Sequence, residues 1–322
     1  MRAFIARRLL QLVPLLLGIS ALTFLLLQLA PGDFLATMAE NPQVPAEALE
    51  QMRRGFGLDQ PWYVQYGLYL RNVFLHFDFG YSFAYRLPVF SVLGKGVLNT
   101  LLLASAAMVV TWGLAIPFGV LAAVRQHRWQ DRTLSVAAFV SLSVPELLSG
   151  MLLLMLAANT GWFPVGNMHS DDAADLGAIA RALDVARHLV LPALVVGLVP
   201  FASRMRQMRA SLLDVLKLDY VTTARAKGLS ESRVVTHHAL RNALNPMITL
   251  FGFTLGSLLS GSFVAETIFS WPGIGTITLE AIRTEDQYLV MGAVLVAATV
   301  LVLGNLAADL LLAAADPRIS HD

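Results

Sequence analysis

Residues 219–246 read DYVTTARAKGLSESRVVTHHALRNALNP, a polar and basic stretch between apolar runs that are long enough to cross a bilayer. The residues up to Lys227 favour a helix, and Gly228 suits the position just past a helix end, where the backbone is left-handed. Ser230 is a suitable N-cap for a second helix, which we expect to run to about Leu244, before Pro246. The stretch therefore predicts two short helices joined by a sharp turn at Gly228.

The composition is that of a membrane protein. Of the 322 residues, 56% are hydrophobic and only 14% are charged, and the mean hydropathy is +0.63. Soluble domains carry about 25% charged residues. The chain has no cysteine, which excludes disulfides, thiolate metal sites and a cysteine nucleophile. A formal net charge of +1 gives no reason to expect a nucleic-acid partner.

Six segments are apolar enough to span the hydrocarbon core as helices, which takes roughly 20 residues each. They are residues 9–29, 99–124, 133–158, 188–204, 246–267 and 289–312. A cleaved signal peptide is the alternative for the first segment, but its apolar region is longer than a signal peptide's and ends in APGD at 30–33, so we expect an uncleaved span. The predicted fold class is all-α, a polytopic membrane protein with six transmembrane helices.

Basic residues set the orientation, because Lys and Arg are retained preferentially on the cytoplasmic side. With six spans both termini share one side, and that side carries 15 of the 23 Lys and Arg residues. We therefore place both termini and the loop at about 204–245 in the cytoplasm. The short basic loop RQHRWQDR at 125–132 is cytoplasmic too, and we interpret it as a solvated turn with an interfacial Trp129.

A large external segment follows the first helix. Its stretch GLDQPWYVQYGLYLRNVFLHFDFGYSF at 57–83 is rich in Trp and Tyr, which favour the membrane interface. The pattern fits a docking platform or gate for an external partner, and it fits equally a structural collar that packs the spans. We expect residues 1–98 to comprise the first helix with this segment, and residues 99–322 to form a five-helix core that carries the cytoplasmic loop.

Four residues are candidates for a pathway or a gate. Glu146 follows Pro145 in the third span, where a carboxylate is costly and usually faces a bundle interior or a wet cavity. It is a candidate to meet a cationic group of a substrate; the alternative is a protonated carboxyl, or one bonded to backbone groups that Pro145 frees. Glu266, Phe269 and Trp271 lie in a stretch where we expect irregular backbone, and they form a candidate external gate, with structural packing as the alternative.

The 219–246 stretch resembles the cytoplasmic coupling segment of binding-protein-dependent ABC importer permeases. Of that family's general pattern (EAA, three residues, Gly, nine residues, IxLP), only Ala224, Gly228 and Leu240 match. The form DYVxTARAKGL followed by HALRNALxP is met almost letter for letter, and it is similar to the dipeptide/oligopeptide/nickel permease family. The same likeness extends to APGD at 30–33, GLDQP at 57–61, FGYS at 79–82, ETIFSWPGIG at 266–275 and DPRI at 316–319.

This resemblance implies a permease subunit that forms half of a translocation pathway for di- or oligopeptides, multi-pass in the inner membrane of a bacterial or archaeal cell. Its partners would be a second homologous permease, two ATPase subunits that bind ATP and Mg, an external solute-binding protein and the lipid bilayer. The helix around 219–227 would sit in a cleft of an ATPase subunit, and closure of the ATPase pair would push it. The small Ala224 and Ala226 would let it seat closely.

The coupling residues that the resemblance implies form one run of the chain. They are Asp219, Tyr220, Thr223, Ala224, Arg225, Ala226, Lys227, Gly228 and Leu229.

The chain contains no Walker A sequence, and no catalytic or metal constellation stands out. We therefore expect no enzyme activity, no catalytic site, no metal site and no cofactor on this chain, with ATP hydrolysis on partner subunits. A machine of the same kind for nickel, glutathione or another small solute remains open. A stand-alone secondary transporter or a membrane enzyme is the remote alternative.

Overall fold

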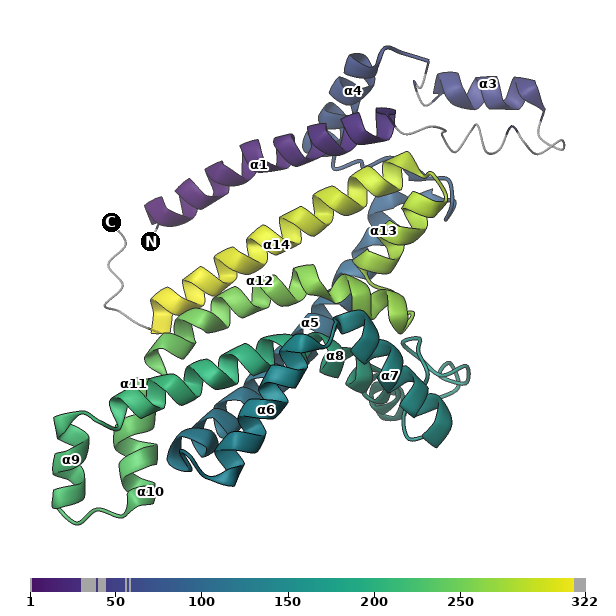
Figure 1. The fold of residues 1–322 in the computed structure, drawn as a ribbon. Coiled ribbons are helices and arrows are strands. Elements are labelled where there is room, and N and C mark those ends of the chain that lie inside the picture. The colour runs from purple at the N-terminus through teal and green to yellow at the C-terminus, as the bar shows by residue number, and fades with distance from the viewer. Residues whose placement is uncertain (1, 30–38, 40–44, 56, 58, 316–322) are drawn as a thin grey trace. The chain divides into compact units, whose positions relative to one another are not determined.

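The computed structural model describes residues 2–29, 39, 45–55, 57 and 59–315 (Figure 1). Within these residues the regular secondary structure is helical, apart from one small two-stranded sheet. The APGD and DPRI motifs, and Leu58 of GLDQP, lie outside the described residues. The chain forms two compact units, the first comprising Met1–Thr100 and Pro272–Val302 and the second Leu101–Trp271 and Leu303–Asp322.

The first unit contains the first helix and the external segment. Its elements are α1 (Arg2–Leu29), α3 (Ala46–Gly55), α4 (Trp62–His76), β1 (Tyr81–Ser82), β2 (Leu87–Pro88), the start of α5 (Val89–Val124), α13 (Ile274–Arg283) and the start of α14 (Gln287–Ala315). Helix α4 packs on α1, where the hydroxyls of Ser20 and Tyr66 are 3.0 Å apart and the rings of Phe24 and Tyr66 are 5.3 Å apart. Aromatic residues of the external segment thus pack directly on a span.

A buried aspartate joins the small sheet to the last helix. Strands β1 and β2 pair antiparallel, with Ser82 opposite Leu87. Asp286, fully buried just before α14, accepts hydrogen bonds from the Ser82 hydroxyl at 2.7 Å and from the amides of Ala84 and Leu289 at 3.1 Å each. Burying a carboxylate is costly unless donors satisfy it, and these three donors do so.

The helices confirm an all-α polytopic protein. Five described helices are long and apolar enough to cross a membrane, and a bent pair makes a sixth span if it is counted as one. The five are Leu10–Leu29 of α1, Val89–Val124, Ala178–Val215, Asn245–Ile268 and Gln287–Ala307 of α14. The helices that contain the second and fourth predicted spans, 99–124 and 188–204, are longer than those spans, since α5 begins at Val89 and α8 extends from Ala178 to Val215.

The third predicted span, 133–158, is not one continuous helix. It is formed by α6 (Trp129–Ser143) and α7 (Glu146–Thr160), which are bent by 106° at the break between them. Val144 is extended, with φ −87° and ψ 121°, as expected for a residue that precedes a proline. Pro145 lacks an amide proton, so it cannot continue the hydrogen-bond ladder of α6. Glu146 therefore lies in the first turn of α7, directly after the break.

The second unit contains the cytoplasmic segment and most of the apolar core. Its elements are the rest of α5, α6, α7, α8 (Ala178–Val215), α9 (Asp219–Ala226), α10 (Glu231–Arg233), the π-helix η1 (Val234–Ala239), α11 (Leu240–Ala243), α12 (Asn245–Ile268) and the end of α14. Close helix contacts depend on glycines. A Cβ at Gly119 would lie 2.8 Å from the Met205 carbonyl oxygen, and one at Gly197 would lie 3.0 Å from that of Ala107. Helix α8 therefore packs close to α5.

Polar side chains connect α8 to two further helices, α6 and α12. Arg209 of α8 donates to Asp131 of α6 from Nε at 2.7 Å and from Nη2 at 2.8 Å. The Asp131 side chain is only 7% exposed, so this ion pair is shielded from solvent. Arg204 of α8 donates from Nε to the Thr254 hydroxyl of α12 at 3.0 Å. The RQHRWQDR loop was interpreted as a solvated turn, and for Asp131 this interpretation was wrong.

Candidate functional site: the cytoplasmic two-helix segment

Residues 219–243 leave the end of α8 as two short antiparallel pieces, which we call the two-helix segment (Figure 1). The first piece is α9, and the second runs through α10, η1 and α11. Leu218 is extended before α9, and Asp219 lies in the first turn, where a negative charge stabilises a helix. The second piece passes into α12 through Leu244, and Pro246 occupies the first turn of α12, as the sequence predicted.

The turn between the two pieces depends on a glycine. Gly228 has φ 78°, a left-handed conformation in which residues with a side chain are disfavoured. Its amide donates to the Arg225 carbonyl at 2.9 Å, and the Lys227 amide donates to the Thr223 carbonyl at 3.1 Å. These bonds satisfy carbonyls at the end of α9 that would otherwise lack a partner. The turn predicted at Gly228 is confirmed.

The second piece differs from the plain helix that the sequence predicted between Ser230 and Leu244. Ser230 has the extended backbone of an N-cap, but its side chain makes no capping hydrogen bond. Six of the following residues, Val234–Ala239, form a π-helix, in which each turn contains an extra residue. This wider turn places Val234, Val235 and Ala239 on the buried side.

One face of α9 is buried against the second piece. Val221 is fully buried and Ala224 is 6% exposed, and the two lie one helical turn apart. They join the apolar core together with Val234, Val235 and Ala239. Ala224 thus packs inside the segment, whereas we expected it to help α9 seat against a partner. Of the two small residues, only Ala226 is exposed.

An ion pair crosses the turn at Gly228. Arg225, near the end of α9, donates to Glu231, at the start of α10, from Nη2 at 2.7 Å and from Nε at 3.1 Å. This hydrogen-bonded guanidinium lowers the pKa of the Glu231 carboxyl, and the carboxylate raises the pKa of Arg225. The bidentate pair links the end of α9 to the start of α10 across the turn.

A second polar contact holds the other end of α9. The Asn242 amide of α11 donates to the Tyr220 hydroxyl at 2.6 Å, and that hydroxyl is 3.5 Å from the His238 carbonyl oxygen. The base of the segment is joined to α8, because the Ser211 hydroxyl donates to the Ala243 carbonyl at 2.8 Å. The two pieces, α8 and the start of α12 therefore form one connected structure.

The remaining side chains of α9 face outward. Exposed on this helix and its turn are Asp219, Tyr220, Thr222, Thr223, Arg225, Ala226, Lys227 and Gly228, while Leu229 is half-buried. The exposed surface is polar and carries both signs of charge. The segment thus presents a small polar surface of mixed charge, and hydrogen bonds and chain continuity connect it to α8 and α12.

The pathway and gate candidates occupy two other places in the second unit. At the start of α7, Glu146 has one carboxylate oxygen, Oε1, that is buried and has no hydrogen-bond partner among the described residues. At the end of α12, Glu266 is fully buried and accepts a hydrogen bond from Ser262 at 3.0 Å. Phe269 and Trp271 are also buried, and the Trp271 amide donates to the Glu266 carbonyl at 2.9 Å.

The positions of these residues do not test their roles. The pathway role of Glu146 and the gate role of the other three residues therefore stay predictions. In this conformation Glu266, Phe269 and Trp271 form a packed end to α12, and the Asn167 amide of the loop between α7 and α8 donates to the Phe269 carbonyl at 2.8 Å. Such packing is the alternative that the irregular sequence left open, and opening a gate here would require all three residues to separate.

Sequence reasoning missed the polar contacts that hold the segment in place. Arg225 belongs to the run of coupling residues that the resemblance implies, but its partner Glu231 lies outside that run. Asp131 was not singled out, although a lone acidic residue within a basic loop is a signal for an ion pair with Arg209.

Comparison with known proteins agrees with this architecture. Residues 115–321 match the family model of the binding-protein-dependent transport system inner membrane component, and residues 1–104 match the N-terminal model of binding-protein-dependent transport system membrane components. The chain is 39% identical to the oligopeptide transport system permease protein AppB of Bacillus subtilis (strain 168), with all of both chains covered.

Two further sequence relatives and one structure are similar to this chain. It is 38% identical to the dipeptide transport system permease protein DppB of Escherichia coli (strain K12), over 100% of this chain and 99% of the relative. It is 37% identical to the glutathione transport system permease protein GsiC of the same strain, over 99% of each chain. A chain of the inward-facing MetNI methionine ABC transporter superposes with a TM-score of 0.53 at 18% identity, covering 70% of this chain and 96% of that one. This last likeness concerns the fold alone.

Proposed function

The chain belongs to the family of binding-protein-dependent transport system inner membrane components, and from this premise we propose that it imports peptides and is driven through its two-helix segment. It is a multi-pass permease subunit of an ATP-binding-cassette importer in the cell inner membrane. The proposal concerns what it carries, which subunits it meets and which residues transmit the energy.

Di- or oligopeptides are the proposed substrates. The relatives that match along their full length at 38–39% identity are named as oligopeptide and dipeptide permeases. The relative named for glutathione is nearly as similar, at 37%, and it favours glutathione as the second candidate. Nickel, which the sequence resemblance also allowed, has no such relative among those described above.

The two-helix segment is the proposed contact for an ATPase subunit. The observation that carries this proposal is the fixed connection of α9, through Gly228, the Arg225–Glu231 pair and the Ser211–Ala243 bond, to the helices α8 and α12. A force on the exposed face of α9 is thereby passed to two spans at once. A flexible loop at this place would absorb the same force.

The remaining subunits follow from the family. We propose a second homologous permease that completes the pathway, two ATPase subunits that bind ATP and Mg, and an external solute-binding protein that delivers the peptide. No ATP site or other cofactor site is proposed on this chain. In this assembly ATP hydrolysis belongs to the ATPase subunits.

Co-purification followed by reconstitution tests this proposal. The chain, extracted from its own membrane in mild detergent, is expected to bring down a Walker A ATPase and a second permease. Proteoliposomes of this complex, with its solute-binding protein, are expected to take up a labelled dipeptide in an ATP-dependent manner. Uptake by the chain alone, or without nucleotide, would contradict the importer and favour a secondary transporter. Uptake of glutathione but not of dipeptides would show that glutathione is the substrate.

A further inference from the structure

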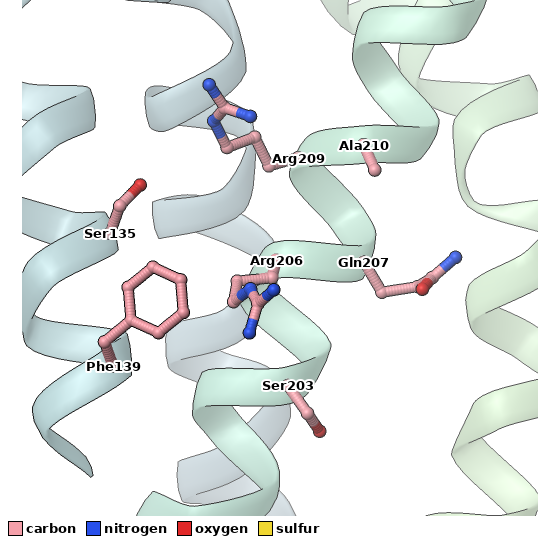
Figure 2. A pocket seen from close by; sticks show the side chains of 7 residues that line it. All are labelled: Ser135, Phe139, Ser203, Arg206, Gln207, Arg209 and Ala210. Carbon is pink, nitrogen blue, oxygen red and sulfur yellow. The ribbon is translucent and has the colours of Figure 1, made fainter. Parts of the chain in front are cut away.

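A cleft of about 510 Å³ lies between α6 and α8, near their cytoplasmic ends. It is lined by Ser135, Phe139, Ser203, Arg206, Gln207, Arg209 and Ala210. Figure 2 shows Ser135 and Phe139 of α6 facing Arg206 and Arg209 of α8 across this cleft, with Gln207 pointing away from α6. Nothing in the proposed coupling mechanism uses these residues.

The two arginines of the cleft differ in their charge balance. The charge of Arg209 is balanced by Asp131, whose carboxylate accepts hydrogen bonds from Nε and Nη2 of Arg209. Arg206 forms no hydrogen bond or ion pair within the described ranges; its only specific contact is with Phe139, whose ring centre lies 4.6 Å below the guanidinium carbon. Stacking on an aromatic face holds a guanidinium in place without consuming its N–H donors. The cleft thus presents a positioned and uncompensated positive charge.

The surface beside the cleft is apolar. Val136, Phe139 and Val140 of α6 are 61%, 54% and 55% exposed, and their spacing places them on one stripe of the helix. Trp129, at the start of α6, is 70% exposed, and Trp at that level is typical of the membrane–water interface. The surface therefore suits an anionic lipid: the fixed cation fits the headgroup, and the neighbouring apolar stripe fits the acyl chains.

We propose that this cleft binds the phosphate of an anionic phospholipid, such as phosphatidylglycerol, in the cytoplasmic leaflet. The Arg206 guanidinium contacts the phosphate oxygens, the Ser135 hydroxyl lines the same cleft, and the acyl chains lie along Val136 and Val140. Basic pockets between transmembrane helices on the cytoplasmic side are suited to such headgroups, and the leaflet there is negatively charged. The bound lipid would hold α6 against α8, next to the Asp131–Arg209 pair.

Native mass spectrometry of the full chain, with whatever subunits it retains in mild detergent, tests the proposal. The wild type is titrated with phosphatidylglycerol and, separately, with phosphatidylcholine. We expect retention of phosphatidylglycerol at lower lipid concentration. Arg206→Gln should weaken this binding about fivefold, which is the loss of one basic residue at an anionic surface. Phe139→Leu, which keeps the apolar stripe but removes the stacking face, should weaken it by a smaller factor.

Arg125→Gln is the matched control, because Arg125 is an exposed arginine just after α5 that does not line the cleft and does not belong to the apolar stripe of α6. If Arg125→Gln weakens binding as much as Arg206→Gln, the attraction is general and the proposal is overturned. Equal affinity of the wild type for the two lipids would overturn it as well. Glycerol phosphate is the soluble probe: displacement of the lipid at equal concentration would show that the cleft binds a free anion. Loss of the second permease from Arg206→Gln would show a protein contact instead.

Discussion

Replacing Gly228 by valine should separate ATP hydrolysis from transport. The residue has φ 78°, where an L-residue with a side chain is disfavoured by roughly 1–2 kcal/mol and a β-branched one by more. A Cβ built at Gly228 meets no atom within 4 Å, so the whole cost comes from the backbone and none from a clash. A cost of about 1–2 kcal/mol changes an equilibrium by a factor of about 5–30.

The expected consequence is local. The turn relaxes to a negative φ, α9 changes direction, and the Arg225–Glu231 pair across the turn is lost. Insertion and abundance should stay normal, because Gly228 lies outside every span. In proteoliposomes of the complex, ATP hydrolysis should continue while peptide uptake per ATP falls by up to the same factor of about 5–30.

Gly228→Asn is the matched control at the same position, since asparagine tolerates the left-handed conformation better than other residues with a side chain. We expect this variant to retain most of the uptake per ATP. Normal uptake per ATP in Gly228→Val would refute the assignment of the turn. An equal loss in both variants would show that the side chain obstructs a partner and that backbone strain is not the cause.

Three further substitutions test the contacts that hold the helices. Val221→Ala should lower the free energy of local opening of α9 by about 2 kcal/mol, and faster amide exchange in α9 measures this change. Glu231→Gln should cost only about 0.2–1 kcal/mol, because its pair with Arg225 is solvent-exposed. Since Arg225 lowers the Glu231 pKa, the contribution is complete above the ordinary value of 4.5 and is lost as the pH falls through the lowered value; amide exchange at the turn, followed against pH, measures it. Asp131→Asn should destabilise α6 against α8 by up to about 3 kcal/mol, because it leaves the charge of Arg209 uncompensated; thermal unfolding in detergent measures it.

For each of these three predictions, one result would contradict the reasoning. For Val221, the exposed neighbour Thr222→Ala should change exchange little, and an equal effect would show that burial is not the cause. For Glu231, a contribution that grows on acidification would contradict the sign of the pKa shift. For Asp131, unchanged unfolding would show that Arg209 finds another partner.

Much of the structure of the cytoplasmic segment could be predicted from the sequence, because local backbone chemistry determines it. Glycine after a helical run predicted the left-handed Gly228, and proline predicted the boundary at Pro246. The inward orientation of Ala224 was also available in principle, since Val221 and Ala224 lie one turn apart. This orientation was not predicted, because the resemblance implies a contact role for both small residues of the helix, whichever face each of them occupies.

Other features depend on contacts that are distant in sequence. The residues of the π-helical turn at Val234–Ala239 did not distinguish it from a plain helix, and three of them pack into the apolar core. The break at Pro145 had a local signal, but hydropathy averages over a window and describes 133–158 as one span. The burial of Asp131 required knowing that α6 lies beside Arg209, 78 residues later in the chain.

The contact of α9 with an ATPase subunit is tested most directly by cross-linking at single cysteines, which the chain allows because it has no cysteine of its own. Ala226→Cys places a thiol on the exposed face of α9, and Ala224→Cys places one on the buried face, two residues away. With a short thiol-to-lysine cross-linker on the assembled complex, Ala226→Cys is expected to join this chain to an ATPase subunit and Ala224→Cys is not. Equal cross-linking at the two positions, or none at Ala226 in a complex that still hydrolyses ATP and transports, would contradict the proposed coupling contact.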